Sequence, residues 1–223
     1  MTIDHLMPLV AGRLTVAAYH GFRPITWSDD GVPAGRDIAF LRAFAAQQQL
    51  ELVVRFAPFE QLWALPGRDW CDVAAAGIAP LPERASPGVV WSAPYFQVQR
   101  ALLIRAADQP RLHTIADMAG RTIAVTRGST AETDARRRAP ATATVVICED
   151  QQSALDALLA GAIDAYGTGD ASCDYLVSTY PGRFAVADRH PYDPPETFAF
   201  ALRAASGVRQ PLDRFIAEHR QDY

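Results

Sequence analysis

The sequence contains no lysine, so every one of its 21 basic residues is an arginine. Schiff-base catalysis by lysine and the phosphate-binding P-loop both require that residue, and both are therefore excluded. The chain has only three cysteines, Cys71, Cys148 and Cys173, at spacings unlike those of a zinc site or a disulfide framework. We expect these cysteines to be small buried side chains, and we expect neither a metal nor another cofactor.

Long apolar runs and an excess of positive charge are also missing. No stretch approaches the roughly 18 apolar residues of a membrane-spanning helix, and residues 1–11 have neither the basic start nor the apolar core of a signal peptide. The net charge of −4 provides no basic patch, so we expect neither nucleic acid nor an anionic membrane surface as a partner. With 223 residues, 49% of them hydrophobic, the chain can bury a core sufficient for one large or two small domains.

Predicted strands alternate with predicted helices, which favours an α/β fold. Apolar runs predict strands at 14–19, 52–56, 72–76, 98–104, 145–148, 184–187 and 197–202. Helices are predicted at 35–44, 151–160 and 207–220, the first with Asp37 near its N-terminus, where the negative charge suits the helix dipole. This alternation is typical of βαβ units with parallel strands.

The stretch DVAAAGIAPLPER, residues 72–84, is the one most typical of a binding site. It combines an apolar strand, a glycine at position 77 and a Pro-rich loop that carries one cation, Arg84. A guanidinium offers a rigid fork of donors that matches a carboxylate or a phosphate. From the residues alone, Arg84 is either such a binding group or a surface arginine in a turn.

This stretch, followed by WSAPYF at 91–96, resembles the signature of the type II periplasmic solute-binding proteins of the polar amino-acid group. Further motifs of that family follow in order, YHGFRP at 19–24, TIADMAGRTIAVTRGST at 114–130 and GAIDAYGTGD at 161–170. The resemblance implies two lobes, each a mostly parallel sheet flanked by helices, joined by a two-stranded hinge. It implies a first lobe of residues 1–98 and 193–223, and a second of residues 99–192 that includes the hinge crossovers.

The resemblance also implies a ligand clasped between the lobes. The residues expected to bind it are Tyr19, Phe22, Phe59, Gly77, Ala79, Arg84, Ser129, Thr130 and Asp170. In this assignment the Arg84 guanidinium and the amides around Thr130 hold a carboxylate, and Asp170 with the Gly77 carbonyl region holds an amine. The Phe22 and Phe59 rings then cover the apolar part. Without the resemblance, helix capping explains Ser129, Thr130 and Asp170 equally well, and packing explains Phe59.

Three departures from the family pattern bear on the ligand. Tyr19 stands where several members carry an acidic residue that helps to hold an amine, which disfavours a basic side chain. Gly77 and Ala79 stand where members often have Ser or Thr, which favours an apolar or aromatic ligand. Asp170 lies six positions after Asp164 where five is usual, so the register of 168–170 stays open.

The function that the resemblance implies is that of a monomeric solute-binding protein. It would deliver a small carboxylate ligand, above all an amino acid, to the permease of an ABC transporter. Exported relatives favour a periplasmic location. Because residues 1–11 carry no export signal, either a signal has been removed or the protein stays in the cytosol.

Two other classes of function stay open. The same fold occurs in cyclohexadienyl dehydratase, and an enzyme of that kind needs a general acid poised beside its substrate. Glu83, Glu132 and His20 lie on relevant loops, but no pattern singles one of them out, so we expect binding without conversion. The second alternative is a ligand-sensing module of a larger receptor.

Overall fold

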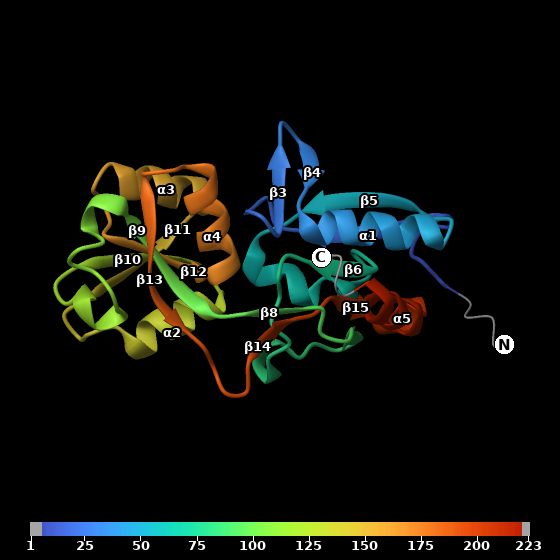
Figure 1. Ribbon diagram of the computed structural model, residues 1–223. Coiled ribbons are helices and arrows are strands. Elements are labelled where there is room, and N and C mark those ends of the chain that lie inside the picture. The colour runs from blue at the N-terminus through green and yellow to red at the C-terminus, as the bar shows by residue number, and fades with distance from the viewer. Residues whose placement is uncertain (1–5, 220–223) are drawn as a thin grey trace. The chain divides into compact units, whose positions relative to one another are not determined.

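The structure, a computed structural model, describes residues 6–219 (Figure 1). The contacts group these residues into two compact units. Unit 1 contains residues 6–20, 25–97 and 197–219, and unit 2 contains Gly21–Pro24 and Val98–Glu196. Residues 1–5, where we expect no export signal, and Arg220, where the closing helix is expected to end, lie outside the described residues.

Unit 1 is built on a five-stranded sheet in the order β5-β1-β6-β15-β7. Its strands are β1 (Arg13–Ala18), β5 (Glu51–Phe56), β6 (Val73–Ala75), β7 (Val89–Trp91) and β15 (Ala201–Arg203). Strand β1 pairs in parallel with β5 and β6, and β15 pairs antiparallel with β6 and β7. The smaller strands β3 (Thr26–Asp29) and β4 (Val32–Ala34) form an antiparallel pair.

The core of unit 1 is aromatic where two helices meet the sheet. Helix α1 (Arg36–Gln47) contributes Phe40 and Phe44, and helix α5 (Arg209–His219) contributes Phe215, whose ring centroid lies 5.0 Å from that of Phe40. These side chains are buried among apolar residues of β1 and β6. The apolar positions of both helices recur at helical spacing, and this spacing places them on one face.

Unit 2 has a sheet of the same kind, in the order β11-β10-β12-β9-β13. Its strands are β9 (Arg100–Arg105), β10 (Thr122–Thr126), β11 (Thr144–Cys148), β12 (Ala165–Gly169) and β13 (Phe184–His190). Strand β10 pairs in parallel with β11 and β12, and β9 pairs antiparallel with β12 and β13. Three helices flank it, α2 (Thr130–Arg138), α3 (Gln151–Leu159) and α4 (Asp170–Thr179) (Figure 1).

Each face of the second sheet has its own core. Leu103 of β9 packs with residues of α3 and α4, such as Leu155 and Leu176, whereas its neighbour Leu102 packs with Ala135 of α2 on the other face. Successive strand residues point to opposite faces, so a strand covered on both sides is apolar throughout. The two-lobed α/β architecture predicted from the sequence is confirmed.

The chain passes between the units through β8 (Phe96–Val98) and β14 (Glu196–Phe198), which pair with each other. The Phe96 and Phe198 rings stack with centroids 5.9 Å apart. The single strand predicted over 98–104 is wrong in detail, because it is divided at Gln99, whose amide donates to the carboxylate of Asp170. The strand predicted at 197–202 is likewise two strands, β14 and β15.

The expectation that the cysteines are small buried side chains is confirmed for two of the three. Cys71 and Cys173 are buried and Cys148 is partly buried, and all three are free. Burial raises the pKa of the Cys71 thiol to about 12 and that of Cys148 to about 11. At neutral pH these cysteines are therefore protonated and poorly nucleophilic.

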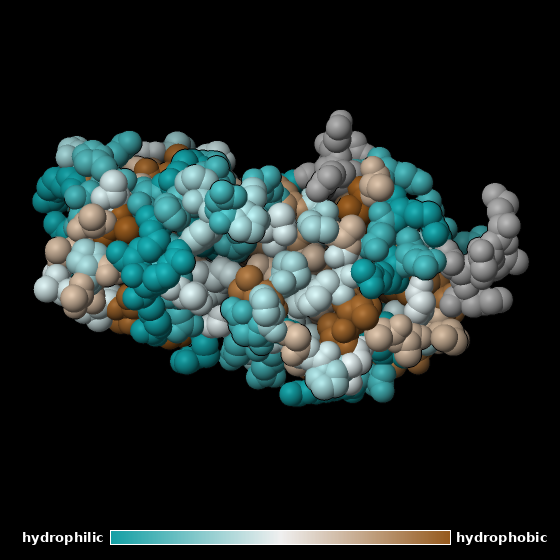
Figure 2. All heavy atoms as spheres, turned by 90° about the horizontal axis from the view of Figure 1, so that it is seen from below, coloured by the Kyte–Doolittle hydropathy of each residue, from teal (hydrophilic) through white to brown (hydrophobic). Residues whose placement is uncertain are grey.

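The described surface has few large apolar side chains. The exposed ones are Met7, Val10, Val32 and Leu159. On the face drawn in Figure 2, hydrophobic residues lie in small separate groups surrounded by hydrophilic and neutral ones. Among residues 6–219, no helix has the length and apolar character needed to cross a bilayer.

The carboxylate of Asp72 holds together distant parts of unit 1. One of its oxygens accepts hydrogen bonds from the Thr15 amide at 3.0 Å and the Thr15 hydroxyl at 2.6 Å. The other accepts from the Leu9 amide at 2.9 Å and lies 3.3 Å from the Arg203 guanidinium. Since Asp72 is fully buried, these partners together stabilise its charge.

We expect Asp72→Ala to lower the free energy of unfolding by about 3–5 kcal/mol, because it leaves Arg203 without its buried anion. Thr15→Val, which removes only one hydroxyl, should cost about 1–2 kcal/mol. Urea denaturation followed by circular dichroism measures both. A loss for Asp72→Ala no greater than that for Thr15→Val would contradict this role.

Candidate functional site

Arg84 is buried at the end of the loop that follows β6. It is the last residue of a 3-10 turn, Pro82–Arg84, and is 4% exposed. Its Nη1 donates to the Ala79 carbonyl at 3.0 Å, and its guanidinium carbon lies 4.6 Å from the ring centroid of Trp63 and 5.7 Å from that of Phe59. The alternative of a surface arginine is therefore wrong. The carbonyl and the ring faces orient the guanidinium and partly offset the loss of its hydration.

The aromatic residues beside Arg84 come from two loops of unit 1. Tyr19 directly follows β1, and Phe59 and Trp63 lie four residues apart in the 3-10 helix Phe59–Ala64. The Phe59 ring meets those of Tyr19 and Trp63 edge to face, with centroids 6.0 and 6.1 Å away. Phe59 thus packs its own helix and also borders the guanidinium, so the two roles considered for it are compatible.

Trp63 is the residue of this group that the sequence does not reveal. It makes the shorter of the two cation–π contacts with Arg84. The available signal is its position four residues after Phe59, a spacing that places both side chains on one face of an α-helix, although the helix formed here is 3-10. Spacing alone does not say that this face meets Arg84.

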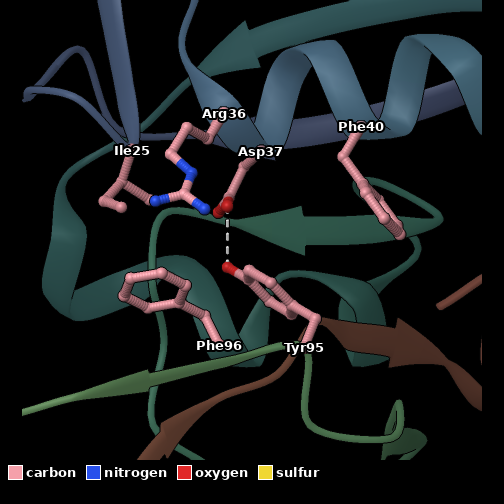
Figure 3. A pocket seen from close by; sticks show the side chains of 6 residues that line it. All are labelled: Ile25, Arg36, Asp37, Phe40, Tyr95 and Phe96. Atoms are coloured by element: carbon pink, nitrogen blue, oxygen red, sulfur yellow. Dashed lines mark hydrogen bonds between the residues drawn. The ribbon is translucent and has the colours of Figure 1, made fainter. Parts of the chain in front are cut away.

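Asp37 supports Gly77, the glycine two residues after the end of β6. Gly77 adopts a left-handed backbone, with φ of 61°, and its amide donates to Asp37 Oδ2 at 3.0 Å. The Tyr95 hydroxyl donates to Asp37 Oδ1 at 2.8 Å (Figure 3). Asp37 lies in the first turn of α1, as predicted, but it is only 1% exposed, so its charge interacts chiefly with these two donors.

A small pocket borders this pair, lined by Ile25, Arg36, Asp37, Phe40, Tyr95 and Phe96 (Figure 3). The Arg36 guanidinium lies over the Phe96 ring at 4.6 Å. Burial raises the pKa of Asp37 to about 7, although the hydrogen bonds from Tyr95 and Gly77 and the charge of Arg36 act to lower it. Burial and the Asp37 charge also raise the pKa of Tyr95 well above its usual value.

In unit 2, Ser129 and Thr130 have different partners. Ser129 is the N-cap of α2, because its hydroxyl accepts from the Glu132 amide at 3.1 Å and donates to the Thr126 carbonyl at 2.7 Å. Thr130 Oγ1 instead donates to Glu196 Oε1 at 2.7 Å. Capping therefore accounts for the hydroxyl of Ser129 and not for that of Thr130.

Asp170 is the first residue of α4, directly after β12 ends at Gly169. One carboxylate oxygen, Oδ1, accepts from the Gln99 amide at 3.2 Å and from the Ala171 amide at 2.8 Å. Across the described residues, no hydrogen bond to Oδ2 is seen. The carboxylate is thus anchored through one oxygen and keeps acceptor capacity on the other.

Phe22 lies in the segment Gly21–Pro24, which is part of unit 2 and is held there by Arg23. The Arg23 amide donates to Gln151 Oε1 at 3.0 Å, and its carbonyl accepts from the Ser172 hydroxyl at 2.7 Å. Gln151 and Ser172, both buried, are two further residues that the sequence does not single out. The expected binding residues therefore divide into Tyr19, Phe59, Gly77, Ala79 and Arg84 in unit 1, and Phe22, Ser129, Thr130 and Asp170 in unit 2.

The residues considered for general acid catalysis are either exposed to solvent or bonded to groups of their own helix and its start. Glu83 and His20 are exposed, and His20 packs edge to face on Tyr19. Glu132 accepts from the Gly128 amide at 2.8 Å and pairs with Arg136 at 2.9 Å, both within or beside its own helix. The described residues include no group of three or more His, Cys, Asp or Glu side chains that could hold a metal.

The raised pKa of Asp37 predicts a pH dependence of stability. Between its usual value of 3.8 and about 7, the folded protein holds a proton that the unfolded chain has lost. The free energy of unfolding should therefore fall as the pH rises through this window, by up to about 1.4 kcal/mol per pH unit, and level off above it. Asp37→Asn should remove this contribution, as measured by urea denaturation from pH 4 to 8.

Asp30→Asn is the matched control, because Asp30 is exposed and the chemical change is the same. Its stability curve should parallel that of the unchanged protein. If Asp37→Asn also gives a parallel curve, then Asp37 titrates near its usual value and the role of burial is wrong.

Solved structures similar to this chain are amino-acid-binding proteins. An ancestral arginine-binding protein bound to arginine matches with a TM-score of 0.83 at 23% identity, over 98% of this chain and 95% of its own. AbpA from Streptococcus pneumoniae, a substrate-binding protein of an amino acid ABC transporter bound to L-arginine, matches with a TM-score of 0.83 at 22% identity, over 95% of this chain and 90% of its own. Holo ArgBP from T. maritima matches with a TM-score of 0.81 at 23% identity, over 93% of this chain and 90% of its own. No curated protein matches the sequence.

These structural matches establish the fold, and the family follows from the sequence. Residues 14–223 match the bacterial extracellular solute-binding proteins, family 3. That span runs from β1 through α5 and includes Arg84, Thr130 and Asp170. The resemblance predicted from the motifs is thus confirmed, and the chain belongs to the bacterial extracellular solute-binding proteins of family 3.

Proposed function

We propose that the protein binds a free amino acid outside the cytoplasm and delivers it to an ABC transporter without converting it. The observation that carries this proposal is the buried guanidinium of Arg84, oriented by the Ala79 carbonyl and the Trp63 ring. A charged group held at 4% exposure gains most from a partner of opposite charge, and its planar fork matches a carboxylate. The α-carboxylate of an amino acid has the required geometry.

The remaining groups fit the rest of such a ligand. Asp170 has one anchored carboxylate oxygen and acceptor capacity on the other, which suits an ammonium group. The rings of Tyr19 and Phe59 offer an apolar border next to Arg84. In unit 2, the start of α2 at Thr130 favours negative charge through the helix dipole.

The proposed ligand has an uncharged side chain. The similar structures include an ancestral arginine-binding protein seen with arginine and also with glutamine. Tyr19 is 4% exposed and carries no negative charge to pair with a guanidinium side chain. We therefore expect neutral and aromatic amino acids to bind more tightly than arginine.

The proposal that the ligand is bound without conversion rests on the solvent exposure or local bonding of the candidate acids. A general acid needs a pKa tuned by burial or by a partner, and it must lie within reach of the reacting atom. Glu83 is exposed to solvent, and Glu132 is engaged at the N-terminus of its own helix. The sensor-module alternative gains no support from any particular residue.

The first test is a thermal-shift screen of amino acids and small carboxylates. A ligand at a hundredfold excess over its Kd should stabilise the protein by about 2.7 kcal/mol. Arg84→Ala should weaken the binding of the amino acid found by about 2–5 kcal/mol, because a buried charge pair is broken. The matched control is Arg68→Ala, since Arg68 is exposed and should leave affinity unchanged. A screen without a hit, or equal losses for both variants, would count heavily against the proposal.

The second test separates the amine from the carboxylate. Asp170→Asn keeps an acceptor for the Gln99 and Ala171 amides but removes the negative charge. Calorimetry should show at least a tenfold loss of affinity for the amino acid and little change for its deaminated analogue. If both ligands weaken equally, Asp170 is structural and its pairing with the amine is wrong.

A further inference from the structure

Arg100 is a second buried arginine, and it lies in unit 2. It is the first residue of β9 and is 4% exposed. Its Nε lies 3.1 Å from Glu196 Oε2, and the side chains of this pair are 5% and 8% exposed. The other oxygen of Glu196, Oε1, accepts from the Thr130 hydroxyl at 2.7 Å. The Glu196 carboxylate therefore bridges the guanidinium and the first residue of α2.

The Arg100 guanidinium is not fully satisfied by this arrangement. Its Nε and Nη2 are buried and neither makes a hydrogen bond in the part of the chain that the structure describes, so the contact of Nε with Glu196 is an ion pair without hydrogen-bond geometry. A Cβ added at Gly169 would lie 3.6 Å from Nη2, which places this nitrogen against the end of β12, one residue before Asp170. A buried N–H without a partner is costly, so Nη2 is suited to a further acceptor.

The start of α2, which contacts Glu196 through the Thr130 hydroxyl, presents further donors. Ser129 satisfies the amides of Glu132 and Thr133 through its side chain and carbonyl. Within residues 6–219, no partner is seen for the amides of Thr130 and Ala131, the first two of the helix. Orphan amides at a helix N-terminus favour an anion. In this structure the carboxylate nearest to them in the hydrogen-bond network is that of Glu196, bonded to the Thr130 hydroxyl.

We propose that Arg100 is a carboxylate-binding cation of unit 2 and that Glu196 attenuates it. The inference rests on the amino-acid binding proposed above. With Glu196 in place, most of the Arg100 charge is already compensated, so a ligand carboxylate that approaches Thr130 meets a nearly neutral pair. Without Glu196, the same carboxylate meets an uncompensated guanidinium. Glu196 therefore sets how strongly unit 2 holds negative charge.

The alternative is that Arg100 and Glu196 form a purely structural ion pair that anchors α2 to β14. The two roles predict opposite results for one variant. Glu196→Gln keeps the length of the side chain and an acceptor for Thr130, but removes the charge that compensates Arg100. If the pair is purely structural, Glu196→Gln should bind carboxylates more weakly than the unchanged protein or equally well, because a broken pair disturbs the start of α2. Attenuation predicts tighter binding of carboxylates.

The experiment is a double-mutant cycle of Glu196→Gln and Arg100→Gln, with calorimetry on the amino acid found in the screen. We expect Glu196→Gln to raise affinity at least tenfold and Arg100→Gln to lower it at least tenfold. The double variant, in which both charges are removed, should fall clearly below Glu196→Gln. Glu218→Gln is the matched control, because Glu218 is exposed on α5, and it should leave affinity unchanged.

Succinate provides a second probe that does not depend on an amino acid being the ligand. The melting temperature of Glu196→Gln should rise more with succinate than that of the unchanged protein, at matched ionic strength, and Arg100→Gln should abolish this gain. A protein that binds no amino acid but shows the succinate gain would contradict the proposed function and support the role of Arg100. No gain for Glu196→Gln, or a gain that persists without Arg100, would overturn the inference. If Glu196→Gln does not fold, unchanged affinity of Arg100→Gln would still refute the inference.

Discussion

The fully buried carboxylate of Asp72 is the interaction on which unit 1 depends. Unit 1 is assembled from separate pieces of the chain, because the second unit is inserted between β8 and β14. Asp72 accepts from Leu9 and Thr15 near one end of the chain and pairs with Arg203 near the other. A fully buried charge requires such partners. Asp72 therefore links β15, which contains Arg203, to β1, which contains Thr15. The loop that carries Arg84 follows β6, the strand that begins directly after Asp72.

Each buried charge near the candidate site is stabilised in a different way. Arg84 has a carbonyl and aromatic faces, Arg100 has a carboxylate, and Asp37 has a hydroxyl and an amide. Arg84 is held by the Ala79 carbonyl and the Trp63 and Phe59 rings, whereas the charge of Arg100 is opposed by the Glu196 carboxylate. Buried residues of the same type are thus stabilised by different groups within one protein.

The parts of the site that the sequence predicted are those with a local pattern. Arg84 lies in a loop after a short strand, and Asp170 opens a helix after another, because glycine and apolar runs mark these boundaries. The family motifs added roles to these positions. Trp63 was missed, since an aromatic residue at helical spacing is equally typical of a core. The division of the run 98–104 was missed as well, because it results from Asp170, which lies 71 positions from Gln99.

The sequence by itself determined the α/β class, the order of strands and helices, the absence of lysine chemistry and the loop in which Arg84 lies. These follow from periodicity and composition, which act over a few residues. Only the tertiary structure decided the partners of the buried charges. Asp37 meets Tyr95 from 58 positions away, and Thr130 meets Glu196 from 66. Such pairs form because sheet topology brings distant strand ends together, and a buried charge must be compensated by whatever group the topology places beside it.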